Sequence, residues 1–292
     1  MSSSDATLKR VSETVAPATP PTVDPRLGEL RRVAIVPALN EEHTIGQVIA
    51  ELRAFDPGLD IVVVDDSSAD GTSRVAAAKG AHVLRLPFNL GIGGAVQTGF
   101  RFAFEQGYDI AVRVDGDGQH DPAQLGRVLE PVLSGDADIV VGSRFASDLT
   151  AGYRSSRSRR LGIRLLAGVV SRIVGQRVTD PTSGFQALNR EGIALFARDY
   201  PHDYPEVEAT VMVFRHRLRL REVPVEMRER GGGRSSITAL RSIYYMVKVL
   251  LAIFVGLFRR DVVPGLEAPA ASPPPPGRKT GSPSATQGEG SK

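Results

Sequence analysis

The chain has 292 residues, of which 41% are hydrophobic and 24% charged, and this composition is ordinary for a globular protein. It contains no cysteine, which excludes disulfides and thiolate zinc sites. Aromatic residues make up 6% of the chain and do not alternate with its Arg clusters, so nucleic acid is not an expected partner.

The net charge of +3 conceals an acidic half followed by a basic segment. Residues 31–150 hold 17 Asp and Glu against 10 Lys and Arg, whereas residues 151–180 hold seven Arg and one Asp. The asymmetry indicates metal binding in the first part and contact with phosphate or anionic lipid in the second.

Strands and helices alternate along the first half of the chain. Strands are predicted at residues 31–39, 59–72, 81–86, 109–118 and 137–145, the second of them ending in acids and turn residues, and helices at 40–55, 73–80, 91–107 and 122–135. Asn40 is the expected N-cap of the first helix. This alternation is typical of an α/β fold, a mostly parallel sheet with helices on both faces.

Both ends of the chain have the composition of disordered segments. Residues 1–30 are rich in Ser, Thr and Pro, and residues 261–292 form a Pro/Gly/Ser tail, so neither can bury a core. Residues 31–235 are predicted to form the α/β domain, and residues 236–260 a membrane-associating helix. No N-terminal stretch has the apolar core of a signal peptide, so a cytoplasmic location is expected.

Polar residues recur at one point in the pattern, where each strand ends. The carboxyl ends of parallel strands meet at one edge of an α/β sheet, and ligands bind there. A single site is therefore predicted, built from four strand ends: Asn40 and Glu41, Asp65 and Asp66, Asp115 and Asp117, and Ser143 and Arg144.

The stretch VRVDGDGQHD places two carboxylates, Asp115 and Asp117, on either side of one glycine. Like charges this close repel, which indicates a bound cation. Gly116 and Gly118 let the backbone turn so that both carboxylates reach one hard cation. Mg²⁺ takes one or two protein carboxylates and completes its shell with phosphate oxygens, so the pair suits a nucleoside diphosphate. An ordinary Asp-Gly turn is the alternative.

Two other patterns have two interpretations each. In RERGGGRSS, glycines open the backbone to an anion and Arg presents a planar fork to phosphate, although a surface loop has the same composition. Asp70, in DGT, either has an N-cap or turn role before the next helix or contacts a ligand.

The segments VPALNEE, VVVDDSSADGT, NLGIGGAVQTGF, VDGDGQHDP, VGSRF and DPTSGFQ occur in this order. With them, residues 31 to about 260 resemble a family 2 glycosyltransferase of the GT-A fold, and more narrowly a polyprenyl-phosphate sugar synthase of the dolichyl-phosphate mannose synthase type. The resemblance implies metal-dependent, inverting transfer of a hexose from a nucleotide sugar to a polyprenyl phosphate. The chain departs from that branch at Gln186, where the branch has Arg, and in the segment after GSRF.

The resemblance also implies a role for each matching position. Mg²⁺ or Mn²⁺ would be held by Asp115, Asp117 and Gln119. Asp117, Arg144 and Arg228 would act in catalysis, and Ser183 and Gly184 would line the acceptor side with Arg144. The nucleotide sugar and its diphosphate would contact Pro37, Ala38, Asn40, Glu41, Asp65, Asp66, Gly94, Asp115, Gly116, Arg228, Arg230 and Ser235.

The acceptor decides whether a general base is needed. A phosphate monoester has a second pKa near ~6 and is largely dianionic at pH 7, so a polyprenyl phosphate needs no strong base. A sugar hydroxyl would need a carboxylate base, for which Glu206 and Glu208 are the candidates. The alternative for Glu208, and for Asp180, is to be a structural partner of the Arg clusters. A non-catalytic nucleotide-sugar-binding protein is a further alternative.

Two apolar segments point to a membrane surface. Residues 157–174 place Leu161, Leu165, Leu166, Val169, Val170 and Ile173 on one helical face and Arg157, Arg160 and Arg164 on another. This is the pattern of an interfacial helix, and equally of a core helix with a solvated Arg face. Residues 243–258, apolar except Lys248, reach about 24 Å, short of the ~30 Å hydrocarbon core. Peripheral or monotopic attachment to the inner face of the cell membrane is therefore expected.

Overall fold

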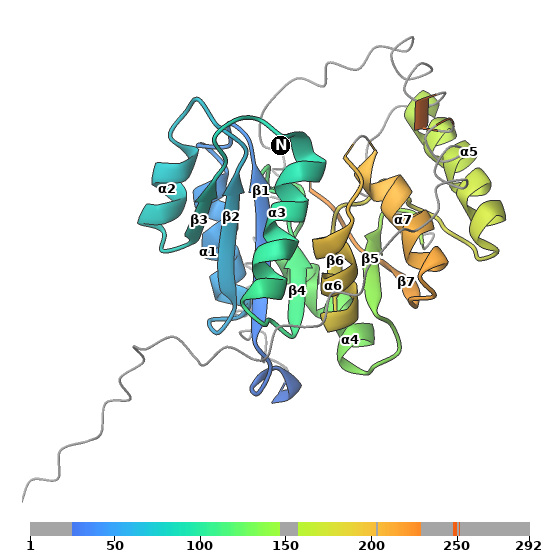
Figure 1. Ribbon diagram of the computed structural model, residues 1–292, viewed down its shortest axis with the longest axis horizontal. Coiled ribbons are helices and arrows are strands. Elements are labelled where there is room, and N and C mark those ends of the chain that lie inside the picture. Colours follow the sequence, from blue (N-terminus) through green and yellow to red (C-terminus); the bar gives the residue numbers. More distant parts are fainter. Residues whose placement is uncertain (1–24, 147–156, 203, 229–247, 250, 252–292) are drawn as a thin grey trace, which may run out of the picture.

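The computed structural model describes residues 25–146, 157–202, 204–228, 248–249 and 251 (Figure 1). Within them, seven strands form one sheet in the order β3-β2-β1-β4-β6-β5-β7. β6 is antiparallel to β4 and β5, and every other neighbouring pair is parallel. The predicted α/β fold with a mostly parallel sheet is confirmed.

The elements predicted before residue 146 all occur, with ends that shift by a few residues. The strands are β1 (Arg32–Ala38), β2 (Asp60–Asp65), β3 (His82–Arg85), β4 (Ile110–Arg113), β5 (Ile139–Ser143), β6 (Gln186–Leu188) and β7 (Leu220–Pro224). The helices are α1 (Ile45–Phe55), α2 (Thr72–Ala78), α3 (Gly91–Glu105), α4 (Leu125–Leu133), α5 (Arg157–Val174), α6 (Arg190–Arg198) and α7 (Pro205–Arg215), with 3-10 turns η1 (Pro25–Leu27) and η2 (Pro122–Gln124).

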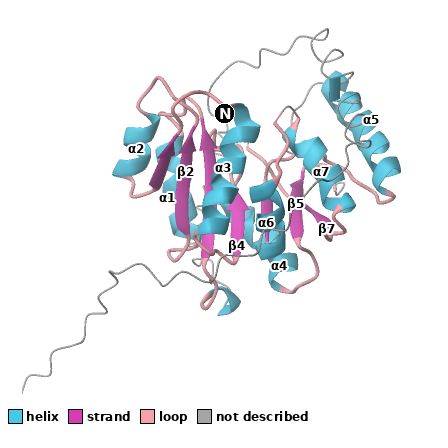
Figure 2. Cartoon of the chain, in the orientation of Figure 1, coloured by secondary structure: helices cyan, strands magenta, loops and turns pink. Residues whose placement is uncertain are grey.

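Helices cover both faces of the sheet, as Figure 2 shows. Successive side chains of a strand point to opposite faces, and β1 follows this rule: Ala34 and Val36 pack with α1 and α4, whereas Val33 and Ile35 pack with α3 and α6. The buried strands thus supply two apolar layers, and their polar ends are left at the edges of the sheet.

The N-terminal segment expected to be disordered through residue 30 is ordered from residue 25. Leu27 is 2% exposed and lies in the core that α1 and α4 cover. Its carbonyl accepts a hydrogen bond from Arg32 Nη1 at 2.5 Å. A single buried leucine in a Pro-rich stretch produces no apolar periodicity, so the sequence pattern did not predict order here. Residues 1–24 and 252–292 lie outside the described residues.

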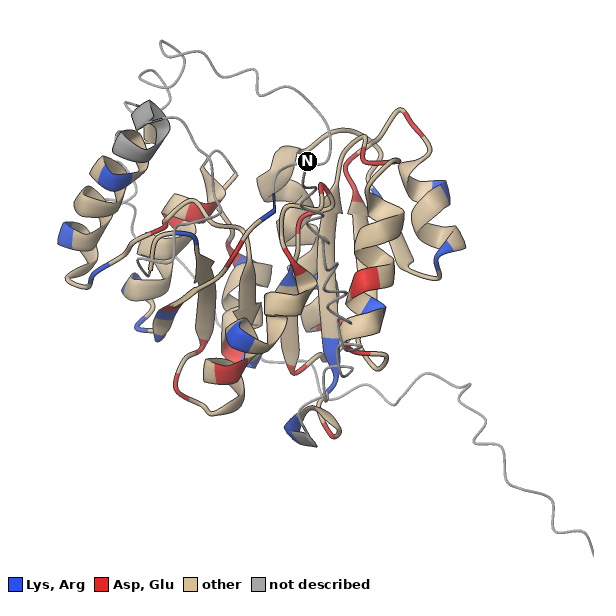
Figure 3. Ribbon diagram, turned by 180° about the vertical axis from the view of Figure 1, so that it is seen from behind, with Lys and Arg blue, Asp and Glu red and all other residues tan. Residues whose placement is uncertain are grey.

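Helix α5 combines features of both interpretations of its sequence. Leu166 and Val170 are buried against α7 and Val249, as in a core helix. Leu165 and Ile173 on the same helix are 58% and 36% exposed, and Figure 3 shows basic residues along it. No helix in the described part of the chain is long and apolar enough to cross a membrane.

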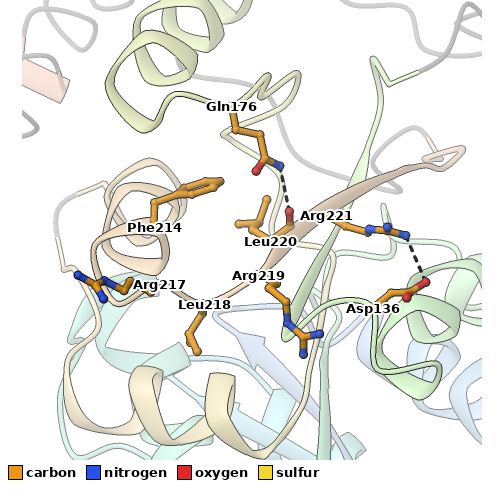
Figure 4. A pocket seen from close by; sticks show the side chains of 8 residues that line it. All are labelled: Asp136, Gln176, Phe214, Arg217, Leu218, Arg219, Leu220 and Arg221. Carbon is orange, nitrogen blue, oxygen red and sulfur yellow. Dashed lines mark hydrogen bonds and ion pairs between the residues drawn. The ribbon is translucent and has the colours of Figure 1, made fainter.

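A pocket of about 400 Å³ lies near the amino ends of β5 and β7, away from the loops predicted to bind ligand (Figure 4). Gln176, Phe214 and Leu220 line part of it, and Arg219 and Arg221 at its rim are paired with Asp138 and Asp136. It is therefore distinct from the site at the carboxyl edge.

Candidate active site at the carboxyl edge of the sheet

Asn40 joins the end of β1 to the loop after β2. Its φ is +56°, its N–H donates to Ser68 Oγ at 2.9 Å, and its Oδ1 accepts from Ala69 N at 2.8 Å. The prediction that Asn40 caps α1 is wrong, because a turn intervenes: Thr44 N donates to Glu41 O at 3.0 Å, and α1 begins at Ile45. The amide side chain instead shapes the candidate site.

The turn that carries Asp115 and Asp117 packs directly against the end of β1. Gly116 N donates to Pro37 O at 3.2 Å, and Gly116 O accepts from Thr44 Oγ1 at 2.7 Å. A Cβ at position 116 would lie 3.2 Å from Ala38 Cβ, so a glycine suits this close approach. Pro37, Ala38 and Gly116, all predicted to contact the nucleotide, are therefore neighbours.

Asp65 and Asp66 are buried, at 1% and 3% exposure, and both organise loops. Asp65 Oδ1 accepts from Ser68 N at 2.8 Å. Asp66 Oδ1 accepts from Leu90 N at 2.7 Å and so fixes the start of α3. In the first turn of that helix, a Cβ at Gly94 would lie 2.5 Å from Leu90 Cβ. These residues define the wall of the site on the β2–β3 side.

Asp70 has the turn role that was one of its interpretations, since the N-cap of α2 is Gly71 and has no side-chain cap bond. Its Oδ1 accepts from Thr72 N at 3.0 Å, and its Oδ2 accepts from Glu42 N at 3.1 Å. Burial pushes the pKa of Asp70 up, but the hydrogen bonds from Thr72 and Glu42 outweigh it and lower the pKa below its usual value.

A buried histidine contacts the turn of residues 115–118, which carries Asp115 and Asp117 and is called the acidic turn below. His120 Nδ1 accepts from Asp115 N at 3.0 Å, and its ring stacks on Phe185 with centroids 5.0 Å apart. Burial lowers the pKa of His120, so the neutral ring can accept this bond. Asp117 Oδ1 accepts from Gln119 N at 3.0 Å, and Gly118 supplies the positive φ of +75° that the turn requires.

The acidic turn fits a divalent cation by its donors. Asp115 and Asp117 present hard oxygen ligands, and their side chains are 30% and 6% exposed. Among the residues the structure describes, no group of three or more His, Cys, Asp or Glu is arranged to hold a metal ion. Two carboxylates alone match a cation whose remaining ligands come from substrate phosphates and water.

Arg113, one strand position before the turn, was not recognised from the sequence. Its side chain is 1% exposed, and Nε donates to Asp115 Oδ1 at 3.2 Å, Nη1 to Tyr200 Oη at 3.1 Å and Nη2 to Glu206 Oε1 at 2.9 Å. Burial lowers the pKa of Arg113, but the charges of Asp115 and Glu206 outweigh it and raise the pKa. A charged residue inside the apolar run IAVRV was the available signal, because buried charges occur where they are paired.

The two candidate bases have structural partners. Glu206 accepts the bond from buried Arg113, and Glu208 Oε1 accepts from Tyr204 N at 3.2 Å at the start of α7. Both carboxylates therefore have a structural contact, Glu206 with an Arg and Glu208 with a backbone N–H.

Arg144, which was predicted to line the acceptor side, has its guanidinium engaged within the protein. Nε and Nη2 donate to the two carboxylate oxygens of Asp180 at 2.7 and 2.8 Å, and Nη2 also donates to Thr182 Oγ1 at 2.8 Å. Asp180 is fully buried. Ser183 Oγ donates to Gly142 O at 2.6 Å and joins this loop to β5. Arg144 therefore holds the loop that contains Ser183 in place.

Arg228 lies beside the acidic turn. Its backbone N–H donates to Gln119 O at 2.9 Å, and its guanidinium donates to Glu51 Oε2 and Asp121 Oδ1, both at 2.7 Å. It is thus within the region where a diphosphate on Asp115 and Asp117 would lie. Arg230 and Ser235, predicted to act with it, lie outside the described residues.

Comparisons with known proteins agree with this fold. Residues 33–195 match the model of the family described as glycosyl transferase family 2. A structure of glucosyl-3-phosphoglycerate synthase from Mycobacterium tuberculosis, in complex with Mn²⁺, UDP and glucosyl-3-phosphoglycerate, aligns over 82% of this chain and 85% of its own with a TM-score of 0.62 and 24% identity. The fold is therefore that of the GT-A glycosyltransferases.

Two curated relatives cover most of the chain. An undecaprenyl-phosphate mannosyltransferase from Micrococcus luteus is 34% identical over 72% of this chain and 88% of its own. A polyprenol monophosphomannose synthase from Mycolicibacterium smegmatis is 31% identical over 75% of this chain and 85% of its own. The protein is a glycosyltransferase, and its chain belongs to glycosyl transferase family 2.

Proposed function

We propose that this protein is a metal-dependent, inverting glycosyltransferase that moves a hexose from a nucleotide sugar to a polyprenyl phosphate. The observation that carries the proposal is the pair Asp115 and Asp117 on a turn that packs against the end of β1 and beside Arg228. Such a turn suits a cation bound to a diphosphate. The lipid acceptor is supported by the two relatives, which are named for undecaprenyl phosphate and polyprenol monophosphomannose.

The residues around the turn have separable roles in this proposal. Asp115 and Asp117 would hold Mg²⁺ or Mn²⁺, with Gln119 as a third ligand, and when bound the cation neutralises charge on the leaving diphosphate. Arg228 would release Glu51 and Asp121 and present its guanidinium to phosphate oxygens. The acceptor phosphate would enter on the side of Arg144 and attack the face of the sugar opposite the diphosphate, which inverts the anomeric carbon.

The protein is proposed to act at the inner, cytoplasmic face of the cell membrane. Leu165 and Ile173 are exposed on α5, next to exposed Arg164 and Arg172. Exposed apolar side chains flanked by Arg suit the boundary between anionic headgroups and acyl chains. This arrangement supports peripheral or monotopic attachment. The proposed membrane-associating helix at 236–260 lies largely outside the described residues.

Product analysis tests the function directly. We expect purified protein, supplied with UDP-, GDP- and dTDP-sugars, polyprenyl phosphate and Mg²⁺ or Mn²⁺, to form a lipid phosphate heavier by one hexose, detected by mass spectrometry. The matched control is the same polyprenol without phosphate, which should give no product. Transfer to a saccharide but not to the lipid phosphate would contradict the acceptor, and no transfer at all would support the non-catalytic alternative.

Replacing Glu206 with Gln separates the two acceptor classes. Gln keeps an oxygen that can accept the hydrogen bond from Arg113 but cannot act as a general base. With a polyprenyl phosphate acceptor we expect kcat to stay within about threefold of the wild type. A saccharide hydroxyl acceptor predicts a loss of about 10²–10⁴, the usual contribution of a general base. Initial rates measured with saturating donor decide between them.

A further inference from the structure

The surroundings of Arg113 restrict its guanidinium to one place. A Cβ at Gly184 would lie 2.7 Å from Arg113 Nη2 and 2.8 Å from Cζ, so the backbone of residue 184 packs on the guanidinium. On another side, Tyr200 Oη accepts from Nη1, and the Tyr200 ring is fixed by Phe196 and Phe100, with centroids 4.9 and 5.9 Å away. The guanidinium therefore cannot move without disturbing the segment just before β6 or this aromatic cluster.

We propose that Arg113 is a positioning residue that sets the orientation of the Asp115 carboxylate for metal binding and couples it to the start of α7. The proposal rests on the proposed function, in which Asp115 holds a divalent cation. Arg113 Nε holds Asp115 Oδ1, and His120 Nδ1 holds the Asp115 backbone N–H. A carboxylate oriented in advance loses less freedom when the cation binds, as with other hydrogen-bonded metal ligands.

The charges of Arg113 and the three carboxylates around it also fit a role in metal binding. Asp115, Asp117 and Glu206 bring three negative charges and Arg113 one positive charge, so two negative charges are left for a divalent cation to neutralise. Removing the guanidinium would increase repulsion between carboxylates that share a partly dry site. Asp115, which is 30% exposed, would then turn toward water.

The guanidinium also connects two sides of the site. Glu206 lies in the first turn of α7 and Tyr200 between α6 and α7, whereas Asp115 follows β4. Since one buried group bonds all three, a displacement of α7 would move the guanidinium and with it the Asp115 carboxylate. Arg113 thus links the metal-binding turn to the segment of chain before and within α7.

The matched control is Arg32, a second largely buried arginine paired with a buried carboxylate. Its side chain is 11% exposed, Asp56 is 3% exposed, and Nη2 donates to Asp56 Oδ1 at 2.9 Å. Arg32 is the first residue of β1, so it lies at the amino ends of the strands, whereas the site lies at their carboxyl ends. Arg32→Met and Arg113→Met therefore remove the same chemical group from similar surroundings, and only the second should affect the acidic turn.

The experiment measures binding rather than turnover. Isothermal titration of the full chain with UDP and GDP, in Mn²⁺ and in EDTA, gives the metal-dependent affinity, and thermal unfolding gives stability. We expect Arg113→Met to weaken the Mn²⁺-dependent affinity by about 10–100-fold, the range for groups that orient metal ligands. Arg113→Lys should recover part of the loss, because an ammonium can still pair with Asp115. Arg32→Met should lower the unfolding temperature and leave the affinity unchanged.

Three outcomes would overturn the proposal: wild-type affinity in Arg113→Met, an equal loss in Arg32→Met, or no recovery in Arg113→Lys. If Arg113→Met does not fold, Tyr200→Phe takes its place, since it removes only the hydroxyl that holds Nη1. A Mn²⁺-dependent affinity equal to that of the wild type in both Tyr200→Phe and Arg113→Lys would then count against the proposal. The proposed function fails separately, by absence of a lipid-linked product from the wild type.

Discussion

Replacing Asp115 and Asp117 together with Asn is expected to abolish metal-dependent sugar transfer, with kcat/KM lowered by at least about 10²–10³. This is the range measured when one group that stabilises a developing anion is removed, and here two carboxylates are lost. Asn keeps the size and one oxygen of each side chain, so the turn closed by Asp117 Oδ1 and Gln119 N can still form. Steady-state rates across a series of Mn²⁺ concentrations measure the loss.

The matched control for this pair is Asp136→Asn. Asp136 is an exposed acid that pairs with Arg221 near the amino end of β5, away from the candidate site, so its loss should leave kcat/KM unchanged. EDTA should reduce the wild type and the control to the level of the double variant. Full turnover by the Asp115→Asn, Asp117→Asn variant would refute the assignment of the metal site.

The sequence predicts the parallel half of the sheet well because each of its elements carries its own periodicity. β1 and β2 are runs of buried residues, and α1 and α3 repeat apolar residues at helical spacing. β6 could not be predicted in the same way, because it has three residues and runs antiparallel between β4 and β5. Its strand conformation is imposed by its two neighbours and not by a local pattern.

The sequence predicted which strand ends form the candidate site, but not the hydrogen bonds that connect their side chains. The strand ends that carry Asp65, Asp115 and Arg144 were expected near one another because parallel strands end at one edge, whereas Arg228 was predicted only from the family resemblance. The bonds from Arg113 to Tyr200 and Glu206 span 87 and 93 residues along the chain, and no spacing rule connects residues so far apart. Asn40 was misassigned for a related reason, because its partners follow β2.

Asp180→Ala is expected to destabilise the fold by about 3–5 kcal/mol, the cost of leaving a buried charge without its partner. Asp180 is fully buried and the Arg144 side chain is 8% exposed, so neither group can recover its hydration in the folded state. For a domain of this size, 1 kcal/mol corresponds to about 2–4 °C, which places the expected fall in unfolding temperature at roughly 10 °C. Calorimetry or circular dichroism measures it.

A double replacement shows whether burial of the charge is the cause. Arg144→Met combined with Asp180→Ala removes both charges, and we expect it to be more stable than Asp180→Ala alone. Asp136→Ala is the exposed counterpart: its pair with Arg221 has both side chains more than half exposed, and its loss should change stability by less than about 0.5 kcal/mol. If Asp180→Ala cost no more than Asp136→Ala, the Arg144–Asp180 pair would not be what holds the acceptor-side loop. If instead the loss is large and the double variant recovers part of it, the unpaired charge of Arg144 is the cause of that part of the loss.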